Sequence, residues 1–361
     1  MKEYKLTISI MASNRKDTLF KMLESIKPIL DNVSSELIVT DTGCDEDTLS
    51  IIRKYTDKII KFTWCNDFSK ARNAGLYAAK GEWFMFVDDD EWFENTDEII
   101  EFFNSGECDQ FEKIEYIQRN YHSMDGATWT DNPVDRGARI VEGIKFEDRI
   151  HEHLNVAGRR IKRFASFVHH YGYVFENDKE KKRHIERNLS LLTKQSEERP
   201  HDCRTYAHII QEYIGMDDYE QIIIWSEKAL DCADYYNINN YRYIGAFYCM
   251  GIYGKIKLGK KEEALNQFGN VYKLEYVSGL ARAMMYYLVC TTQGDDIEGR
   301  ICNDKKLILY INGYLSLRKH YTENKQKFYD ESTIFVKHAF DDDKVIEMLN
   351  VGKAFATKYA R

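Results

Sequence analysis

Strand-like and helix-like segments alternate along the first 90 residues of this 361-residue chain, and this alternation restricts the fold more than any other feature. The apolar runs predict strands over residues 6–11, 36–40, 58–62 and 83–87, with helices over residues 18–26, 48–55 and 68–79 between them. Repeated β-α-β units indicate an α/β domain with a mostly parallel sheet and helices on both faces. Ligands of such sheets bind beyond the carboxyl ends of the strands, so the residues that follow each strand carry the functional information.

Four consecutive acids, Asp-Asp-Asp-Glu at residues 88–91, follow the last of these strands. Carboxylates held just beyond a buried strand can share a divalent metal ion with a phosphate-bearing ligand. The alternative is an exposed acidic turn that caps a helix. The first strand delivers residues 12–15 to the same edge, and the second delivers residues 40–43. Neither G-x-G-x-x-G nor G-x-x-x-x-G-K follows the first strand, so neither a dinucleotide oxidoreductase nor a P-loop NTPase is favoured.

Composition excludes several other classes of protein. A hydrophobic content of 43%, a charged content of 30% and only 3 prolines are typical of an ordered globular chain. The formal net charge of −8 argues against nucleic-acid binding. The 8 cysteines form no C-x-x-C pair, and the N-terminal residues form neither a signal-peptide core nor a membrane-spanning segment. We therefore expect a cytoplasmic protein without a transmembrane segment.

The second half of the chain changes character from about residue 176, where long amphipathic helical patterns replace the strands. Residues 215–222 and 258–265 resemble each other at a spacing of about 42 residues, which is longer than the 34 of a tetratricopeptide repeat. We interpret this half as degenerate helix-turn-helix repeats with a long connection near residues 234–240, and an irregular helical bundle is the alternative. The predicted domains are an α/β domain over residues 1–175 and an all-α, tetratricopeptide-like domain over residues 176–361.

Four segments of the first half together resemble the family 2 glycosyltransferases, which have the GT-A fold. In chain order they are SIMASNR at residues 9–15, ELIVTDTG at residues 36–43, DFSKARNAG at residues 67–75, and the acids at residues 88–91. The resemblance implies a GT-A (Rossmann-like) catalytic domain over residues 1–175. It also implies a hexosyltransferase-type reaction, in which an inverting, metal-dependent enzyme moves a sugar from a nucleotide donor to an acceptor.

The same resemblance assigns metal ligands. The family's D-x-D aspartates correspond to Asp88 and Asp90, which would bind Mg²⁺ or Mn²⁺. His170 fits the place where many GT-A enzymes have a further ligand, and a buried hydrogen-bonding histidine is its alternative. A Lewis acid there would neutralise the nucleoside diphosphate that glycosyl transfer expels.

The resemblance places further residues at the nucleotide sugar. Asp41 corresponds to the acid that contacts the base, and a carboxylate can accept from the imide N–H of uracil, which favours a UDP-sugar. A helix cap is the alternative for Asp41, and a structural ion pair is the alternative for Arg72. The full predicted set is Ser13, Asn14, Asp41, Arg72, Asn73, Asp89, Glu91 and Arg139, where Arg139 and its neighbour Arg136 are expected to line the donor or acceptor pocket.

A second constellation, Arg-Ile-His-Glu-His-Leu at residues 149–154, lies where the family carries its acceptor-side acid. Glu152 is the candidate general base, and His151 is its competitor. We expect a strand here, with His151 and His153 on one face and Glu152 on the other. A zinc site is not favoured, because no third ligand and no H-E-x-x-H spacing accompany the histidines.

The layout of a GT-A domain followed by tetratricopeptide-like helices resembles the peptide S-glycosyltransferases that modify glycocin bacteriocins, and also many bacterial transferases. A peptide or protein acceptor with a reactive Cys or Ser side chain is one expectation, and a cell-envelope saccharide or lipid-linked acceptor is the other. The helices would bind the acceptor or form a homodimer. A non-catalytic helical scaffold is the rival from another class. A nucleotidyltransferase is disfavoured because residues 12–16 lack its glycine- and lysine-rich loop.

Overall fold

The computed structural model describes residues 3–267 apart from residues 157, 159, 176, 238–240, 261 and 265, and beyond them only residues 312, 350, 354 and 358. The chain divides into two compact units, Met1–His184 and Ile185–Arg361, and the division falls inside helix α5 (Asp178–Glu198). Within the described ranges, no helix combines the length and the apolar character needed to cross a membrane.

Unit 1 is built on an eight-stranded sheet with the strand order β3-β2-β1-β4-β7-β6-β10-β5. Its strands are β1 (Tyr4–Ala12), β2 (Ser35–Asp41), β3 (Ile59–Lys61), β4 (Gly81–Asp88), β5 (Glu91–Phe93), β6 (Lys113–Tyr121), β7 (Trp129–Arg139) and β10 (Ile161–His170). A separate two-stranded sheet joins β8 (Phe146–Glu147) to β9 (His153–Leu154). Strands β3, β2, β1 and β4 are all parallel, and β6 and β10 are also parallel to each other. The mostly parallel sheet predicted from the sequence is confirmed.

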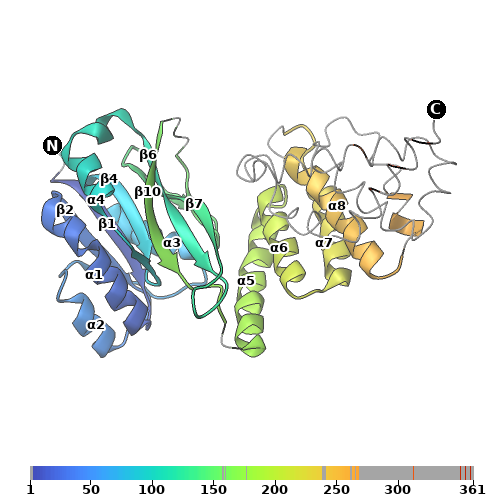
Figure 1. Cartoon of the computed structure of the whole chain (residues 1–361), viewed down its shortest axis with the longest axis horizontal. Helices are drawn as coiled ribbons and strands as arrows, with labels where there is room; N and C mark the ends of the chain where they lie inside the picture. The colour runs from blue at the N-terminus through green and yellow to red at the C-terminus, as the bar shows by residue number, and fades with distance from the viewer. Residues whose placement is uncertain are drawn as a thin grey trace. The chain divides into compact units, whose positions relative to one another are not determined.

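Helices cover both faces of this sheet (Figure 1). The helices of unit 1 are α1 (Lys16–Asn32), α2 (Glu46–Ile52), α3 (Phe68–Ala78) and α4 (Asp97–Asn104), with a 3-10 turn at Glu107–Gln110. Alternate residues of β4 face opposite ways, because a strand has a side-chain period of two. Trp83 and Met85 join the core under α1 and α4, whereas Phe84 and Phe86 pack on the α3 side.

Gly75 lets helix α3 pack directly against β1 and β2. A Cβ added at this position would collide with the hydroxyl of Ser9 on β1 and would lie 3.3 Å from the hydroxyl of Thr40 on β2. Asp67 caps the start of α3 by accepting from the backbone N–H of Lys70 at 3.1 Å. The helix therefore begins at the edge where β1, β2 and β4 end, and its first turns are held against that edge.

The described part of unit 2 is entirely helical. Its helices are the end of α5, then α6 (Cys203–Gly215), α7 (Tyr219–Cys232) and α8 (Tyr241–Lys257). Consecutive helices are joined by tight turns, except between α7 and α8, where the long connection expected near residues 234–240 is present as far as residue 237. The helical pattern expected from residue 268 to residue 349 lies outside the described residues.

Two turns of unit 2 are equivalent at the spacing expected from the sequence. After α6, the backbone N–H of Asp218 donates to the carbonyl of Tyr213 at 3.1 Å, and after α8 that of Lys260 donates to the carbonyl of Lys255 at 2.8 Å. Each residue of the second turn follows its counterpart by 42 positions in the sequence. Both turns also pass through the left-handed region at matching positions, with φ 54° at Asp217 and φ 75° at Gly259. The similarity between residues 215–222 and 258–265 thus corresponds to one repeated helix-turn-helix junction.

Candidate functional site

The ends of three parallel strands meet at one edge of the sheet, as the sequence predicts. Ala12 on β1 pairs with Asp41 on β2, and Met11 pairs with Asp88 on β4. The loop after β1 contacts the acids directly, because Asp89 accepts from the backbone N–H of Ser13 at 2.9 Å and from its hydroxyl at 2.8 Å. We call residues 88–91 the acidic edge.

Arg72 on α3 connects the acidic edge to Glu152. Its Nη2 donates to Asp88 Oδ1 and its Nε donates to Glu152 Oε1, while the guanidinium lies 4.6 Å from the centre of the Phe86 ring. The side chain of Arg72 is only 6% exposed. One buried cation therefore holds the proposed metal ligand and the proposed general base together, from segments 64 residues apart in sequence.

Arg136 on β7 forms a second bridge at the acidic edge. Its Nη1 lies 3.0 Å from Asp88 Oδ2, and its Nη2 donates to Glu91. Glu91 is fully buried and also accepts from the hydroxyl of Tyr116 at 3.1 Å and from the amide of Gln118. A fully buried carboxylate surrounded by these donors is a structural anchor of the edge.

The pKa values of these acids diverge because their partners differ. Burial raises the pKa of Glu91, and the nearby Arg136 only partly opposes this. Burial also acts on Asp88, but Arg72 and Arg136 outweigh it and hold the pKa of this carboxyl well below its usual range. Burial raises the pKa values of Asp89 and Asp90, with Arg15 opposing the shift at both.

The loop that carries Glu152 is tied to α3. The side-chain amide of Asn73 donates to the carbonyl of Phe146 at 3.0 Å and accepts from its N–H at 2.8 Å, and the N–H of Phe68 donates to the carbonyl of Arg149 at 2.8 Å. Asn73, predicted to contact the nucleotide sugar, thus uses its amide group to hold the start of β8. These hydrogen bonds link α3 to the segment that precedes Glu152.

The strand expected around Glu152 is wrong in its extent. His151 has a backbone φ of 55°, which a β-strand cannot accommodate, and strand β9 begins only at His153. His151 and His153 therefore do not share a strand face. Glu152 instead lies in the bend before β9, where it reaches Arg72.

Asp41 lies at the end of β2 and organises the loop that follows. Its Oδ1 accepts from the backbone N–H groups of Gly43 at 2.9 Å and Cys44 at 2.7 Å. Burial would raise the pKa of Asp41, but these two N–H groups outweigh it and lower the pKa. The cap of α2 is a different residue, Asp45, which accepts from Thr48 N at 2.8 Å. The thiol of Cys44 also interacts with the Asp41 carboxylate.

Asn14 connects this loop to the loop after β1. Its side-chain oxygen accepts from the backbone N–H of Asp45 at 2.6 Å. Ser13, Asn14 and Asp41 therefore belong to two adjoining loops at one strand-end edge, next to Asp89. The structure brings together this part of the predicted nucleotide-sugar set.

Arg139 does not join the site, and its predicted role there is wrong. Strand β7 is antiparallel to β4, so Arg139 pairs with Trp83 near the start of β4. Its guanidinium contacts Glu82 and donates to the carbonyls of Cys108 and Phe111, both at 2.9 Å. Trp83 and Asp88 are five positions apart on β4, about 17 Å at the usual rise of a strand. Arg136, three residues earlier, takes the place at the acidic edge.

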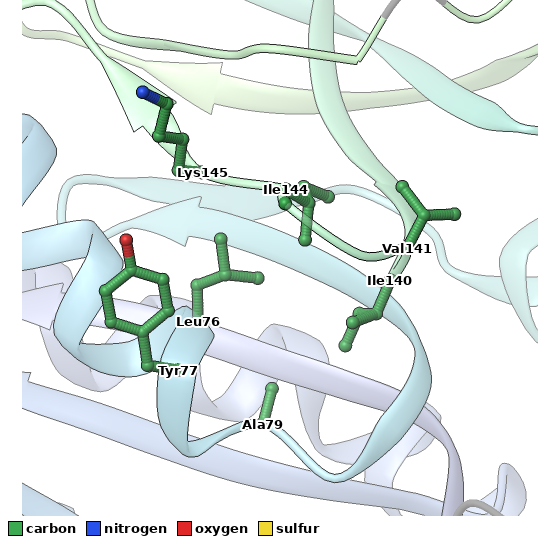
Figure 2. A pocket seen from close by; sticks show the side chains of 8 residues that line it. Leu76, Tyr77, Ala79, Ile140, Val141, Ile144 and Lys145 are labelled. Carbon is green, nitrogen blue, oxygen red and sulfur yellow. The ribbon is translucent and has the colours of Figure 1, made fainter.

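A shallow cavity of about 430 Å³ also lies away from the acidic edge (Figure 2). Its wall is mostly apolar and comes from the end of α3 and from the segment after β7: Leu76, Tyr77, Ala79, Ile140, Val141, Gly143, Ile144 and Lys145. The N–H of Ile140 donates to the carbonyl of Glu82 at 2.9 Å, which places the cavity at the edge where β4 begins. It is separate from the candidate site.

Comparison with known proteins agrees with this geometry. Residues 7–167 match the family model described as "Glycosyl transferase family 2". This range contains the acidic edge, Arg72, Arg136 and Glu152.

Residues 7–167 form a glycosyltransferase family 2 domain.

Individual relatives extend this result. The chain is 27% identical over 252 residues to the SPbeta prophage-derived glycosyltransferase SunS of Bacillus subtilis, a match that covers 66% of this chain and 54% of that protein. It is 31% identical over 121 residues to the Escherichia coli UDP-Glc:alpha-D-GlcNAc-diphosphoundecaprenol beta-1,3-glucosyltransferase WfaP, covering 32% of this chain and 46% of that protein. The chain thus spans about half the length of these relatives. The match to SunS is longer than unit 1, so it includes part of the helical unit.

Among solved structures, the crystal structure of S. aureus TarS is similar at a TM-score of 0.39 and 13% identity, covering 79% of this chain and 52% of that chain. The family 2 domain and the mostly parallel sheet, both expected from the sequence, are confirmed by the family model and by the sheet described above.

The acidic edge of the family 2 domain has suitable donor chemistry for Mg²⁺ or Mn²⁺, because hard cations prefer carboxylate oxygens. Asp88 and Asp90 have partly exposed side chains, at 26% and 20%. Each faces an arginine, however, and among the described residues no group of three His, Cys, Asp or Glu side chains is placed to hold a metal ion. The predicted set of Asp88, Asp90 and His170 is therefore not assembled in this arrangement.

His170 lies at the end of β10, beside Asn120 on β6 and Glu91 on β5. Its Nδ1 is 2.6 Å from the side-chain oxygen of Asn120, and its ring is close enough to interact electrostatically with Asp88 and Asp90. The hydrogen bond to Asn120 leaves Nε2 as the nitrogen available to a ligand. A role as metal ligand stays a prediction.

Proposed function

We propose that this chain is an inverting glycosyltransferase that moves a sugar from a nucleotide donor to an acceptor nucleophile. The observation that carries the proposal is the buried Arg72 bridge between Asp88 and Glu152 inside a family 2 domain. It joins the acids at the strand ends to a carboxylate on a separate loop. The two glycosyltransferase relatives support the same class of reaction.

The donor in this proposal is a UDP-sugar. Asp41 Oδ1 accepts from two N–H groups of the loop backbone, and Oδ2 is the proposed acceptor for the imide N–H of uracil. Ser13 and Asn14 lie in the adjoining loop and would line the nucleotide pocket. The name of WfaP specifies a UDP-glucose donor, which supports the same choice here.

Glu152 is the proposed general base. Arg72 donates to its Oε1, and Oε2 is the proposed atom that accepts the proton of the acceptor nucleophile. The nucleophile would attack the anomeric carbon opposite the diphosphate, whose bond to the sugar breaks as the new bond forms. His151, the competing base, lies one residue earlier in the same bend, and no contact described here links it to Arg72.

Mg²⁺ or Mn²⁺ would be held by Asp88 and Asp90, with His170 as a candidate third ligand, and would supply charge neutralisation for the leaving diphosphate. Asp89 and Glu91 act differently in this proposal. Asp89 fixes the loop of Ser13, and Glu91 anchors Arg136. Both thereby position the acidic edge from inside the protein.

The acceptor we propose is a peptide or protein with a reactive Cys or Ser side chain, bound by the helices of unit 2. The equivalent junctions of α6–α7 and of the segment after α8 support a repeat architecture, which offers extended surfaces for peptides. The second candidate is a lipid-linked saccharide, because the name of WfaP specifies such an acceptor. A homodimer through the helices and a cytoplasmic location stay predictions.

Thermal denaturation with nucleotides and metals tests the donor site. UDP with Mn²⁺ should raise the melting temperature of the protein, and Asp88→Asn should abolish the metal-dependent part of the increase. A non-catalytic scaffold would show no such increase, and a preference for GDP would contradict the role of Asp41.

Donor hydrolysis, followed by mass spectrometry of Cys- and Ser-containing peptides and of lipid-linked saccharides, tests the reaction. Glu152→Gln should reduce transfer by about 10²- to 10⁴-fold, as expected for loss of a general base. Glu147→Gln is the matched control, since Glu147 lies on β8 and pairs with Lys145 at 3.0 Å. Equal activity of the two variants would refute the role of Glu152.

A further inference from the structure

The guanidinium of Arg15 lies at the acidic edge, where it contacts two of the four acids. Its Nη1 lies 3.3 Å from Asp89 Oδ1 and donates to Asp90 Oδ2. The side chain of Arg15 is 48% exposed, whereas those of Arg72 and Arg136 are less than one-tenth exposed. Arg15 is therefore the most exposed of these three arginines. Its guanidinium can move away from the acids without a rearrangement of buried arginine side chains.

The charges around the edge show why a cation is needed there. Asp88, Asp89, Asp90, Glu91 and Glu152 are five carboxylates, and the three arginines compensate for three of them. Departure of Arg15 would leave Asp89 and Asp90 without a cationic partner among the ion pairs described. A guanidinium has no lone pair for a metal, so Arg15 and a metal ion compete for the same oxygen of Asp90.

The backbone position of Arg15 determines where its side chain can go. Arg15 follows Ser13 and Asn14, and its N–H donates to the carbonyl of Ser13 at 2.9 Å. Its own carbonyl accepts from the N–H of Leu19 at 2.9 Å, in the first turn of α1. The backbone is thus held in the loop proposed to line the nucleotide pocket, and a released guanidinium remains beside the donor.

We propose that Arg15 is an internal counter-cation of the acidic edge, that a divalent metal ion displaces it, and that the displaced guanidinium binds the diphosphate of the donor. The displacement of Arg15 by a metal ion concerns the metal alone. The binding of the diphosphate by Arg15 rests on the proposed function. Arginine suits this exchange because its planar donors fit either carboxylate or phosphate oxygens. Removal of Arg15 should therefore have opposite effects on the metal and on the nucleotide.

Arg15→Gln in the full chain tests the exchange, with Lys16→Gln as the matched control. Lys16 is the next residue and is 39% exposed, but it pairs with Asp45 and Asp47 at 3.2 and 2.8 Å, outside the acidic edge. Mn²⁺ binding without nucleotide is measured by the electron paramagnetic resonance signal of free Mn²⁺. Loss of one partly exposed competing ion pair should tighten Mn²⁺ binding roughly fivefold in Arg15→Gln and leave Lys16→Gln like the wild type.

UDP binding at saturating Mn²⁺ is then measured by calorimetry. Arg15→Gln should weaken UDP binding by roughly tenfold or more, which corresponds to one charge-assisted hydrogen bond. Mn²⁺ affinity that is unchanged or weaker in Arg15→Gln would overturn the competition, and unchanged UDP affinity would overturn the transfer to diphosphate. If the wild type binds Mn²⁺ but no nucleotide, the proposed function fails while the Mn²⁺ comparison still decides the competition.

Discussion

Replacing Arg136 by Met should destabilise unit 1 by leaving Glu91 as an unpaired buried charge. Arg136 is 7% exposed and Glu91 is fully buried, so solvent cannot replace the lost partner. Removing one member of a buried ion pair costs about 3–5 kcal/mol. In the variant, Tyr116 and Gln118 still donate to Glu91, and Arg72 still pairs with Asp88. We therefore expect the free energy of unfolding to fall by about 3 kcal/mol, the lower end of this range.

The cost should depend on pH. Burial already raises the pKa of Glu91, and without Arg136 the pKa rises further. A raised folded-state pKa means that stability falls as pH increases from the unfolded value, about 4.3, through the folded value. The destabilisation by Arg136→Met should therefore be largest at neutral pH and should shrink below about pH 4, where Glu91 is protonated in both states.

Urea unfolding followed by tryptophan fluorescence measures this cost. A Trp225→Phe background confines the signal to unit 1, because the other four of the 5 tryptophans, among them the fully buried Trp83, lie there. Arg139→Met is the matched control on the same strand, and its partly exposed contacts should be worth only about 1 kcal/mol.

The double variant Arg136→Met/Glu91→Gln should recover at least about 2 kcal/mol, since no charge is then left unpaired. The reasoning is refuted if Arg136→Met costs no more than Arg139→Met, or if Glu91→Gln restores nothing.

Three further changes test other parts of the chain. Gly75→Ala should lower the free energy of unfolding by about 1–3 kcal/mol in urea, because the new methyl group collides with the Ser9 hydroxyl. Adding Ser9→Ala should restore part of this loss, and simply additive losses of the two substitutions would argue against the contact. Asp41→Asn should destabilise the protein more at pH 7 than at pH 2 in thermal melts. A lowered pKa of Asp41 contributes stability above about pH 3.9, and this stability is lost as the pH falls through the folded-state value. In unit 2, Gly259 has a φ of 75°, so Gly259→Ala should lower the stability by about 1–2 kcal/mol, as measured by circular dichroism. Gly251→Ala inside α8 should instead stabilise the protein, and equal effects of the two substitutions would contradict the left-handed turn.

The first half of the fold was predictable because its signals are local. Strands β1, β2, β3 and β4 appear at the predicted segments, and Asp45 and Asp67 cap the helices that follow two of them. Parallel strands joined by helices bring their carboxyl ends to one edge whatever the details of packing. The meeting of Ser13, Asp41 and Asp88 at one edge therefore followed from the order of elements.

The antiparallel part of the sheet was less predictable. Arg136 and Arg139 lie three residues apart on β7, and the register of β7 against β4 alone decides which one reaches the acidic edge. That register depends on the lengths of the loops before and after β7, which no short sequence pattern encodes. The only sequence signal for Arg136 was its presence beside Arg139 in one glycine-containing segment.

By itself, the sequence determined the family 2 domain, the strand-end edge of acids and the helical second half, because each depends on residue order and local periodicity. Only the tertiary structure decided how the acids are partnered. Arg15, Arg72 and Arg136 come from a loop, a helix and an antiparallel strand, and each meets carboxylates from distant segments. Long-range ion pairs depend on the approach of separate elements to within a few ångströms, and that approach is a property of packing rather than of residue order.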